Sequence, residues 1–175
     1  ISLWVALIAT LLATIIGCSY GILSALMGGW VDRVLLYILD IILAIPMLLI
    51  VIVVQALGES SMIKVVLVIG LTSWANVARI VRTESCRLLQ TTFIQAAITI
   101  GCSPFQVVMR HLFPNLLAPL IVVMTVGIGH AILLETTLSF LNLGIPITSY
   151  PSWDNIMSNG MSALLSGSWW IVVFP

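Results

Sequence analysis

Long apolar runs separated by short polar turns occupy most of this chain. They predict membrane-spanning helices over Leu3–Met27, about Val34–Leu57, about Lys64–Val81 and about Asn115–Leu138. A further apolar run opens at Trp169 and begins a fifth span. A helix needs roughly 20 residues to cross about 30 Å of hydrocarbon, and the first four runs approach or exceed that length. The expected fold class is therefore all-α: a polytopic bundle of transmembrane helices with about five spans.

Glycine and proline mark where these helices should end, bend or touch. Gly28 and Gly29 end the first span, because two successive glycines break a helix. Pro46 lies inside the second expected span and should kink it. Gly127 and Gly129 form a pair of small residues suited to close helix contact in the fourth span.

Two polar segments should lie outside the membrane. The first covers about residues 83–114, where Thr83–Gln90 should continue the third span as a helix. A short separate helix should follow over Ile94–Ile100, and Gly101 should stop it, since glycine permits a sharp reversal. The second segment, about residues 139–168, is rich in Ser, Gly, Pro and Asn and predicts an extramembrane loop.

A third helix should begin within the first polar segment. Ser103 followed by Pro104 is typical of an N-cap and a first helical residue. We expect this helix to run through His111 and to end before the fourth span.

Basic residues are concentrated on one side of the predicted bundle. The 83–114 loop, the end of the helix before it and the Gly28–Arg33 turn hold five of the six, namely Arg33, Arg79, Arg82, Arg87 and Arg110. The turns on the opposite side hold only Lys64. Cytoplasmic loops carry an excess of Lys and Arg, so we expect the 83–114 loop to face the cytoplasm and the 139–168 loop to face outward.

Composition agrees with an integral, multi-pass protein of the cell membrane. Of the 175 residues, 61% are hydrophobic and 7% charged, and the mean hydropathy is +1.25. A soluble domain carries about 25% charged residues. The formal net charge of zero removes the electrostatic argument for a nucleic-acid partner. The chain opens and stops inside apolar runs, so we interpret residues 1–175 as a single transmembrane domain, the core of a longer chain.

Motifs for catalysis or metal binding are missing from the sequence. A nucleotide-binding P-loop needs Gly-Lys-Ser/Thr, and the single lysine, Lys64, lies between Ile63 and Val65. Neither H-E-x-x-H nor G-x-S-x-G occurs, and the three cysteines show no paired spacing. His111 and His130 belong to different elements. We therefore expect no enzyme activity and no cofactor or metal bound by this chain.

One stretch of the polar loop suggests a docking element. Two adjacent alanines, Ala96 and Ala97, lie at the centre of a short predicted helix, and Gly101 ends it. Pro114 follows thirteen residues after that glycine. Small side chains let another surface approach the helix backbone closely, so this helix is suited to contact a partner protein.

These residues resemble the permease subunits of ABC importers. In that family the cytoplasmic loop carries Glu-Ala-Ala, a glycine and a Leu-Pro ending, and Ala96, Ala97, Gly101 and Pro114 match its spacing. Gln95 stands where the family usually has Glu, which keeps hydrogen bonding without the charge. Further matches point to the C-type subunit of dipeptide, oligopeptide or nickel importers: Gly28-Gly29 with Asp32, Asp40 and Pro46, His111–Asn115, Glu135–Leu141 and Pro151–Trp153.

The resemblance implies partners and a mechanism. Two ATP-binding cassette subunits, which bind ATP and Mg²⁺, would drive transport by alternating access. A second, homologous permease would complete the pathway as a heterodimer in the membrane lipid, and an extracytoplasmic binding protein would deliver substrate. The expected ATPase-coupling residues are Gln95, Ala96, Ala97, Gly101, Ser103, Pro104 and Pro114.

The substrate and the transport class each have alternatives. Peptides are the first choice of substrate, and nickel or another metal chelate is the second. An ATP-independent channel or secondary transporter is the alternative class. Such proteins place polar or ionisable groups or broken helices near mid-membrane, whereas here polarity concentrates in the 83–114 loop.

For the remaining charged residues, a structural role is the alternative to a role in transport. Arg79, Arg82, Arg87 and Arg110 should set topology, the long side chains of the first three extending to the membrane surface. Glu84 is spaced to pair with Arg87 and stiffen the loop.

Three polar residues fall within the spans. Asp40 lies about 9 Å inside the second span on a face similar to that of Arg33, which favours a structural pair or cap over a role in translocation. Glu135 should lie near the outer surface, where it either holds the external loop or lines the outer vestibule. His130, beside glycines, favours a hydrogen bond in helix packing over a nickel ligand.

Overall fold

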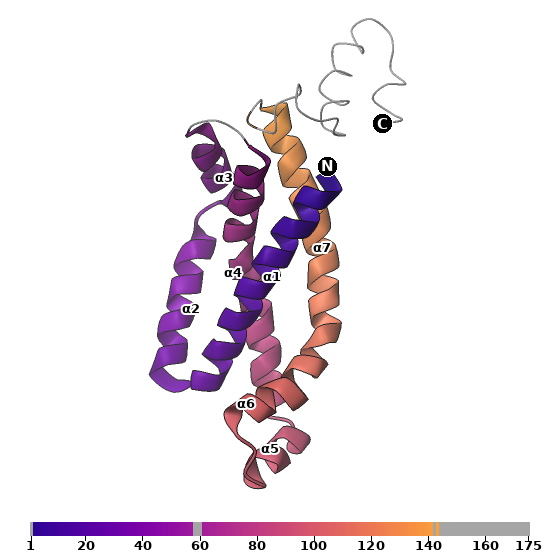
Figure 1. The fold of residues 1–175 in the computed structure, drawn as a ribbon. Helices are drawn as coiled ribbons and strands as arrows, with labels where there is room; N and C mark the ends of the chain where they lie inside the picture. Colours follow the sequence, from indigo (N-terminus) through magenta and orange to yellow (C-terminus); the bar gives the residue numbers. More distant parts are fainter. Residues whose placement is uncertain (1, 58–60, 142, 144–175) are drawn as a thin grey trace, which may run out of the picture.

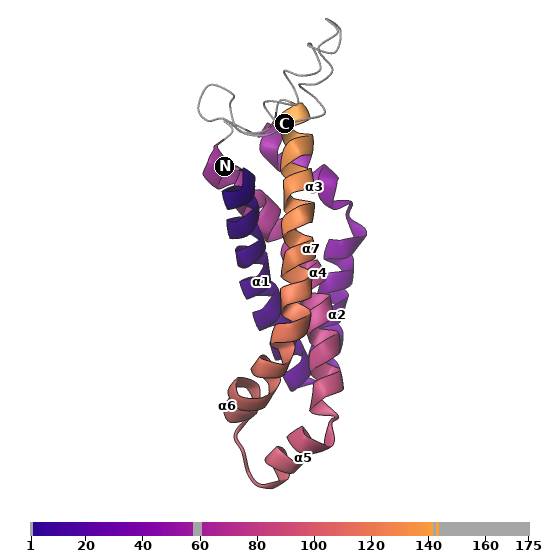
Figure 2. The same cartoon turned by 90° about the vertical axis from the view of Figure 1, so that its right-hand side faces the viewer.

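A computed structural model describes residues 2–57, 61–141 and 143 of the chain, and every regular element in them is helical. Three long helices lie alongside one another, a shorter pair flanks them, and a small helical segment closes one end (Figures 1 and 2). In chain order the elements are α1 (Ser2–Met27), α2 (Gly29–Ala44), α3 (Met47–Ala56), α4 (Met62–Leu89), α5 (Thr92–Thr99), α6 (Pro104–Val107), the π-helix η1 (Val108–Leu112) and α7 (Phe113–Phe140).

Several helices are long and apolar enough to cross a membrane. In the described part these are Ser2–Met27, Met62–Leu89 and the continuous helix Pro104–Ser139, and the bent pair α2 and α3 counts as a fourth if it forms one span. The prediction of an all-α bundle is confirmed. The run from Trp169 and nearly all of the 139–168 loop lie outside the described residues, and α7 continues to Phe140.

The tightest packing in the described part joins α1 to α4. Small residues on α1 recur every fourth position and are buried: Ala9, Ala13, Gly17 and Gly21. A Cβ atom placed on Gly17 would lie 2.7 Å from the carbonyl oxygen of Trp74, and one on Gly21 would lie 2.7 Å from that of Ala78. The two backbones therefore touch directly, as in small-residue helix pairs in membranes.

The second expected span is not one helix. The structure breaks it into α2 and α3, which are bent by 70° relative to each other. Ile45 has the extended conformation that a following proline favours, and Pro46 has no N–H to continue the helical hydrogen bonds. The predicted kink at Pro46 is thus confirmed, and it divides the expected span Val34–Leu57 into two separate helices.

The first helical turn of α2 begins earlier than expected. Gly28 and Gly29 have φ values of 57° and 56°, in the left-handed region that favours glycine. The chain therefore reverses within these two residues, and α2 starts at Gly29 rather than near Val34. Asp32 and Arg33 consequently belong to the helix itself.

The glycine pair of the fourth span is only half in contact with the bundle. A Cβ atom on Gly127 would lie 3.1 Å from the side chain of Thr10, which confirms close approach to α1. A Cβ atom on Gly129 would meet nothing within 4 Å.

The helix that begins at Pro104 does not end at His111. Ser103 caps it through a complete capping box with Gln106, as Ser103-Pro104 predicts. The helix then passes through the π-helical turn η1 directly into α7, so the candidate span Pro104–Ser139 is 36 residues long. Pro114 lies just after the π turn, at the start of α7, where the hydrogen-bond pattern already changes and its missing N–H is tolerated.

Candidate functional site

The helix α5 lies at one end of the molecule, between the end of α4 and the start of α6 (Figures 1 and 2). Two side chains fix it to α4: the Gln95 Nε2 donates a hydrogen bond of 2.7 Å to the Leu89 carbonyl, and the Thr91 hydroxyl donates one of 2.5 Å to the Leu88 carbonyl. Gly101, at φ 97°, then reverses the chain. The predicted stop at Gly101 is confirmed.

The inner face of α5 is part of the hydrophobic core. Ile94 is fully buried in a cluster that it shares with Leu88 of α4, Val107 of α6 and Leu116 of α7. Ala97 is also buried against the chain. This placement differs from the expectation that both alanines face a partner, because adjacent helical residues point about 100° apart and only one can face outward.

The outer face of α5 and the neighbouring turn are exposed and mixed in polarity. Gln95 and Ala96 are exposed there. Large apolar side chains are also exposed at this end. The most exposed are Ile100, at 84%, and Phe105, at 73%. Arg110 is exposed nearby in η1. Exposed apolar side chains within one short segment are suited to contact a protein partner.

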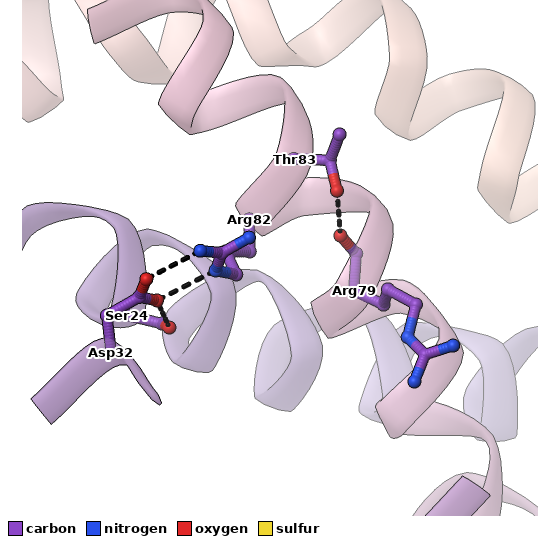
Figure 3. Close-up of polar contacts among 5 residues, drawn as sticks. All are labelled: Ser24, Asp32, Arg79, Arg82 and Thr83. Atoms are coloured by element: carbon purple, nitrogen blue, oxygen red, sulfur yellow. Dashed lines mark hydrogen bonds and ion pairs between the residues drawn. The ribbon is translucent and has the colours of Figure 1, made fainter. Parts of the chain in front are cut away.

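A partly buried ion pair joins α2 to α4 just above this end. The guanidinium of Arg82 donates two hydrogen bonds to Asp32, of 2.7 Å from Nε to Oδ1 and of 2.5 Å from Nη2 to Oδ2. The Ser24 hydroxyl of α1 donates a third, of 2.6 Å, to Oδ1 (Figure 3). The side chains of Arg82 and Asp32 are 22% and 15% exposed. We call Ser24, Asp32 and Arg82 the α1–α2–α4 clamp.

The other arginines of α4 are paired as well. Arg79 forms an ion pair with Asp40 of α2, and its side chain points away from the clamp (Figure 3). Arg87 pairs with Glu84 at 2.8 Å, as their spacing predicts. Arg79 and Arg82 were expected to extend to the membrane surface, and the structure shows that each is paired with an acidic residue. Asp40 has a structural pair, but its partner is Arg79 rather than the Arg33 of its own helix.

Two of the polar residues within the spans differ in environment. His130 is exposed and lines a groove of about 790 Å³ between α1, α4 and α7, together with Thr10, Ser73 and Asn76. In the part of the chain that the structure describes, neither His130 nor Asn76 has a hydrogen bond to its side chain. Glu135, by contrast, is only 1% exposed, so its side chain is buried rather than lining an open vestibule.

Sequence reasoning missed the clamp. Asp32 entered only as part of a family motif, and Ser24 was not singled out. The spacing between Asp32 and Arg82 carries no signal, since the two lie 50 residues apart. One signal was available in the sequence. Asp32 lies three residues after the Gly28-Gly29 pair, at the start of a helix, and the last turns of α4 are rich in arginine.

The chain belongs to the family of binding-protein-dependent transport system inner membrane components. The model of that family matches residues 17–174. It is 33% identical over 175 residues to the dipeptide transport system permease protein DppC of Bacillus subtilis (strain 168), covering 100% of this chain and 54% of that protein. It is 32% identical over 169 residues to the oligopeptide transport system permease protein OppC of the same organism, covering 97% of this chain and 55% of that protein. The chain thus spans a little over half the length of these relatives.

A solved structure shares the fold. The MetNI methionine ABC transporter in an inward-facing conformation matches with a TM-score of 0.61 and 18% identity, over 98% of this chain and 89% of the compared chain. This likeness supports the multi-pass helical fold of an inner-membrane component. Among the described residues, no three of His, Cys, Asp and Glu are grouped so that they could hold a metal ion.

Proposed function

We propose that this chain is the membrane core of a permease subunit in an ATP-driven peptide importer. The observation that carries the proposal is the 33% identity to a dipeptide permease along the whole chain. Relatives named for oligopeptide and D,D-dipeptide transport match over nearly the same length. The chain would form half of the pathway, and a second, homologous permease would form the other half.

The outer face of α5 is the proposed contact for an ATP-binding cassette subunit. Ala96 offers a small side chain where a partner surface can approach the backbone, and Gln95 offers a carboxamide already held by α4. Ile100 and Phe105 follow in the chain and add exposed apolar area at this end of the molecule. Because the inner face of α5 is packed on three other helices, force applied to α5 would move the helix bundle rather than a loose loop.

Ala97, Gly101, Ser103, Pro104 and Pro114 would act behind this surface. The small side chain of Ala97 lets α5 lie close to the helices that it packs against. Gly101 allows the chain reversal that places α5 at the end of the molecule. Ser103 and Pro104 start the helix that continues past Pro114 into α7. These residues position the contact surface rather than form it.

The arginine-rich end is the proposed cytoplasmic side. Arg33, Arg82, Arg87 and Arg110 lie on elements at the α5 end, and Lys64 lies at the opposite end, at the start of α4. Loops with an excess of basic residues remain in the cytoplasm, where ATP-binding subunits would meet α5. The extracytoplasmic binding protein would then dock at the end where α3 and the last turn of α7 lie.

The groove beside His130 is the proposed wall of the pathway. Polar side chains are costly when they face lipid, so Asn76 and His130 are better suited to face water or a hydrophilic solute. Asp40, paired with Arg79, and Glu135, buried in the bundle, are assigned structural roles.

Reconstitution of the full-length protein with its partner permease, ATPases and binding protein tests this function. We expect peptide import that depends on ATP, and ATP hydrolysis that rises when peptide-loaded binding protein is added. A nickel chelate in place of peptide should stimulate neither. Import by the chain alone without ATP, or stimulation by the nickel chelate only, would refute the proposal.

A matched pair of variants tests the role of α5. Ala96→Glu places a charge on the exposed face of α5 and should abolish stimulated ATP hydrolysis without loss of the protein from the membrane. Thr83→Glu adds the same charge at an exposed position of α4, two turns away from α5, and should leave stimulation intact. Equal activity of both variants would remove α5 from the contact.

A further inference from the structure

The clamp lies at the point where three helices meet. Arg82 contacts α1 through its backbone, because a Cβ atom on Gly21 would lie 2.8 Å from the Arg82 nitrogen. Its side chain reaches Asp32 in the first turn of α2, and Asp32 accepts a further hydrogen bond from Ser24 of α1. One residue of α4 therefore holds both α1 and α2.

The helix α2 has few other attachments. Leu39 is its single buried residue, packed in a small cluster with Ala75 and Ala78 of α4. The Tyr20 hydroxyl donates one hydrogen bond of 3.0 Å to the Leu35 carbonyl, and the Asp40–Arg79 pair is largely exposed. Exposed ion pairs contribute little, whereas a bidentate, partly buried arginine–carboxylate pair is geometrically specific.

The covalent connection of α2 to α1 runs through glycine and has no side-chain packing of its own. Only Gly28 separates the two helices; its N–H bonds to the Ser24 carbonyl at 3.3 Å, and a Cβ atom on Gly28 or Gly29 would meet nothing within 4 Å. At its other end α2 leads into the 70° bend before α3. Both ends of α2 are thus breaks in the helical backbone, and the clamp is the main polar restraint between them.

The clamp also lies close to α5 along a rigid path. Arg82 is seven residues from the end of α4, which is about 10 Å of continuous helix. Gln95 and the buried Ile94 join α5 to that same helix end. A displacement of α5 is therefore carried by α4 to Arg82 without a flexible segment between them.

We infer that Asp32 and Arg82 are positioning residues that make α2 move together with the ATPase-contacting end of α4. In their absence α5 would still engage the ATPase, but α2, and with it the bent α2–α3 segment, would no longer follow. This inference rests on the proposed function, and it adds the route by which motion at α5 reaches the bent α2–α3 segment.

The test uses the assembled transporter with substitutions in this chain. Asp32→Asn and Arg82→Gln should each lower peptide import about tenfold, while basal ATP hydrolysis stays within about twofold of the wild type; changes of this size are those measured for residues that carry coupling without touching a ligand. The matched control is Arg33→Gln, which removes an adjacent exposed charge with no ion pair in the described part of the chain. It should leave import unchanged.

Exchanging the charges of Asp32 and Arg82 distinguishes loss of the ion pair from the change of charge at either position. The double variant Asp32→Arg, Arg82→Asp restores the pair with opposite polarity, and Ser24 can accept as well as donate a hydrogen bond. We expect it to import faster than either of its two single variants. The inference is overturned if Asp32→Arg and Arg82→Asp each import peptide as fast as the wild type. It is also overturned if the double variant imports no faster than either of them.

A distance measurement distinguishes positioning from simple folding. Spin labels at Tyr37→Cys on α2 and Thr83→Cys on α4, both exposed, would be placed in a background where Cys18, Cys86 and Cys102 are serine. The distance should stay constant between nucleotide-free and ATP-bound wild-type complex and should change between these states in Asp32→Asn. The inference is overturned if the distance in the wild type changes between these states as much as it does in Asp32→Asn. It is also overturned if neither Asp32→Asn nor Asp32→Glu assembles into the complex. A wild-type complex that imports no peptide instead refutes the proposed function and leaves these distances as the separate test of the clamp.

Discussion

Replacing Gly17 by alanine should weaken the contact between α1 and α4. The new Cβ atom would lie 2.7 Å from the Trp74 carbonyl oxygen and 2.7 Å from the Val77 Cβ, and 2.9 Å from the Ala78 nitrogen. Two of these three atoms belong to the α4 backbone, so no side-chain rotation relieves the overlap. The helices have to separate locally.

The size of the effect follows from that separation. Carbon atoms pack best at about 3.5–4.0 Å, so the helices would move apart by about 1 Å, and a gap of that size forfeits a quarter to a half of the attraction between neighbouring atoms. Overpacking of this kind typically costs about 1–3 kcal/mol. The folded-to-unfolded ratio would then fall roughly 5- to 150-fold.

Gly129→Ala is the matched control. It makes the same chemical change in a membrane helix, but its Cβ atom would meet nothing within 4 Å. Both variants gain the higher helix propensity of alanine, so the difference between them isolates the steric overlap.

Thermal unfolding of the purified complex in detergent measures that difference. A domain of this size loses about 2–4 °C in Tm per kcal/mol, so Gly17→Ala should unfold about 2–12 °C below Gly129→Ala. Equal Tm values would refute the conclusion that the α1 and α4 backbones are in direct contact.

Three further outcomes are expected. Gly101→Val forces a β-branched side chain into φ 97° and should cost about 1–3 kcal/mol, seen as a lower Tm and weaker stimulation of ATP hydrolysis; wild-type values for both would contradict the strain. Ser103→Ala removes the capping box and should destabilise the start of α6 by about 1 kcal/mol, measured as faster amide exchange in Pro104–Val107, whereas unchanged exchange would mean that the cap is dispensable. Cysteines introduced at Asn76 and His130 should react with a membrane-impermeant thiol reagent in the assembled complex if the groove faces the pathway, and a lack of reaction at both positions would remove the groove from it.

Much of the fold could be predicted because it depends on local properties of the chain. The apolar runs placed α1, α4 and α7 within a few residues of their observed bounds, and Ser103-Pro104 and Gly101 marked a helix start and a helix stop through their own backbone preferences. The bend at Pro46 was visible for the same reason. Each of these features is decided by residues that are neighbours in sequence.

The remainder depends on contacts between distant segments. A bidentate pair between Asp32 and Arg82 requires knowledge of which helices pack together, and the sequence alone left Arg82 without a partner. The burial of Ala97 required the orientation of α5 relative to α4 and α7. The continuation of α6 into α7 through a π turn was missed because Pro114 favours a helix boundary when read only from its neighbours.

The break between α2 and α3 has a consequence for which surface lipid can touch. Where a helix ends, its last carbonyls and the first N–H groups of the next helix lose their partners within the helix. Around Pro46 the Ile45 N–H bonds to the Ile42 carbonyl at 3.4 Å, which satisfies only part of this set. Hydrocarbon offers no hydrogen bonds, so irregular backbone at membrane depth must be covered by protein or by water. Acyl chains are therefore excluded from the backbone of this bend, which only protein or water can cover.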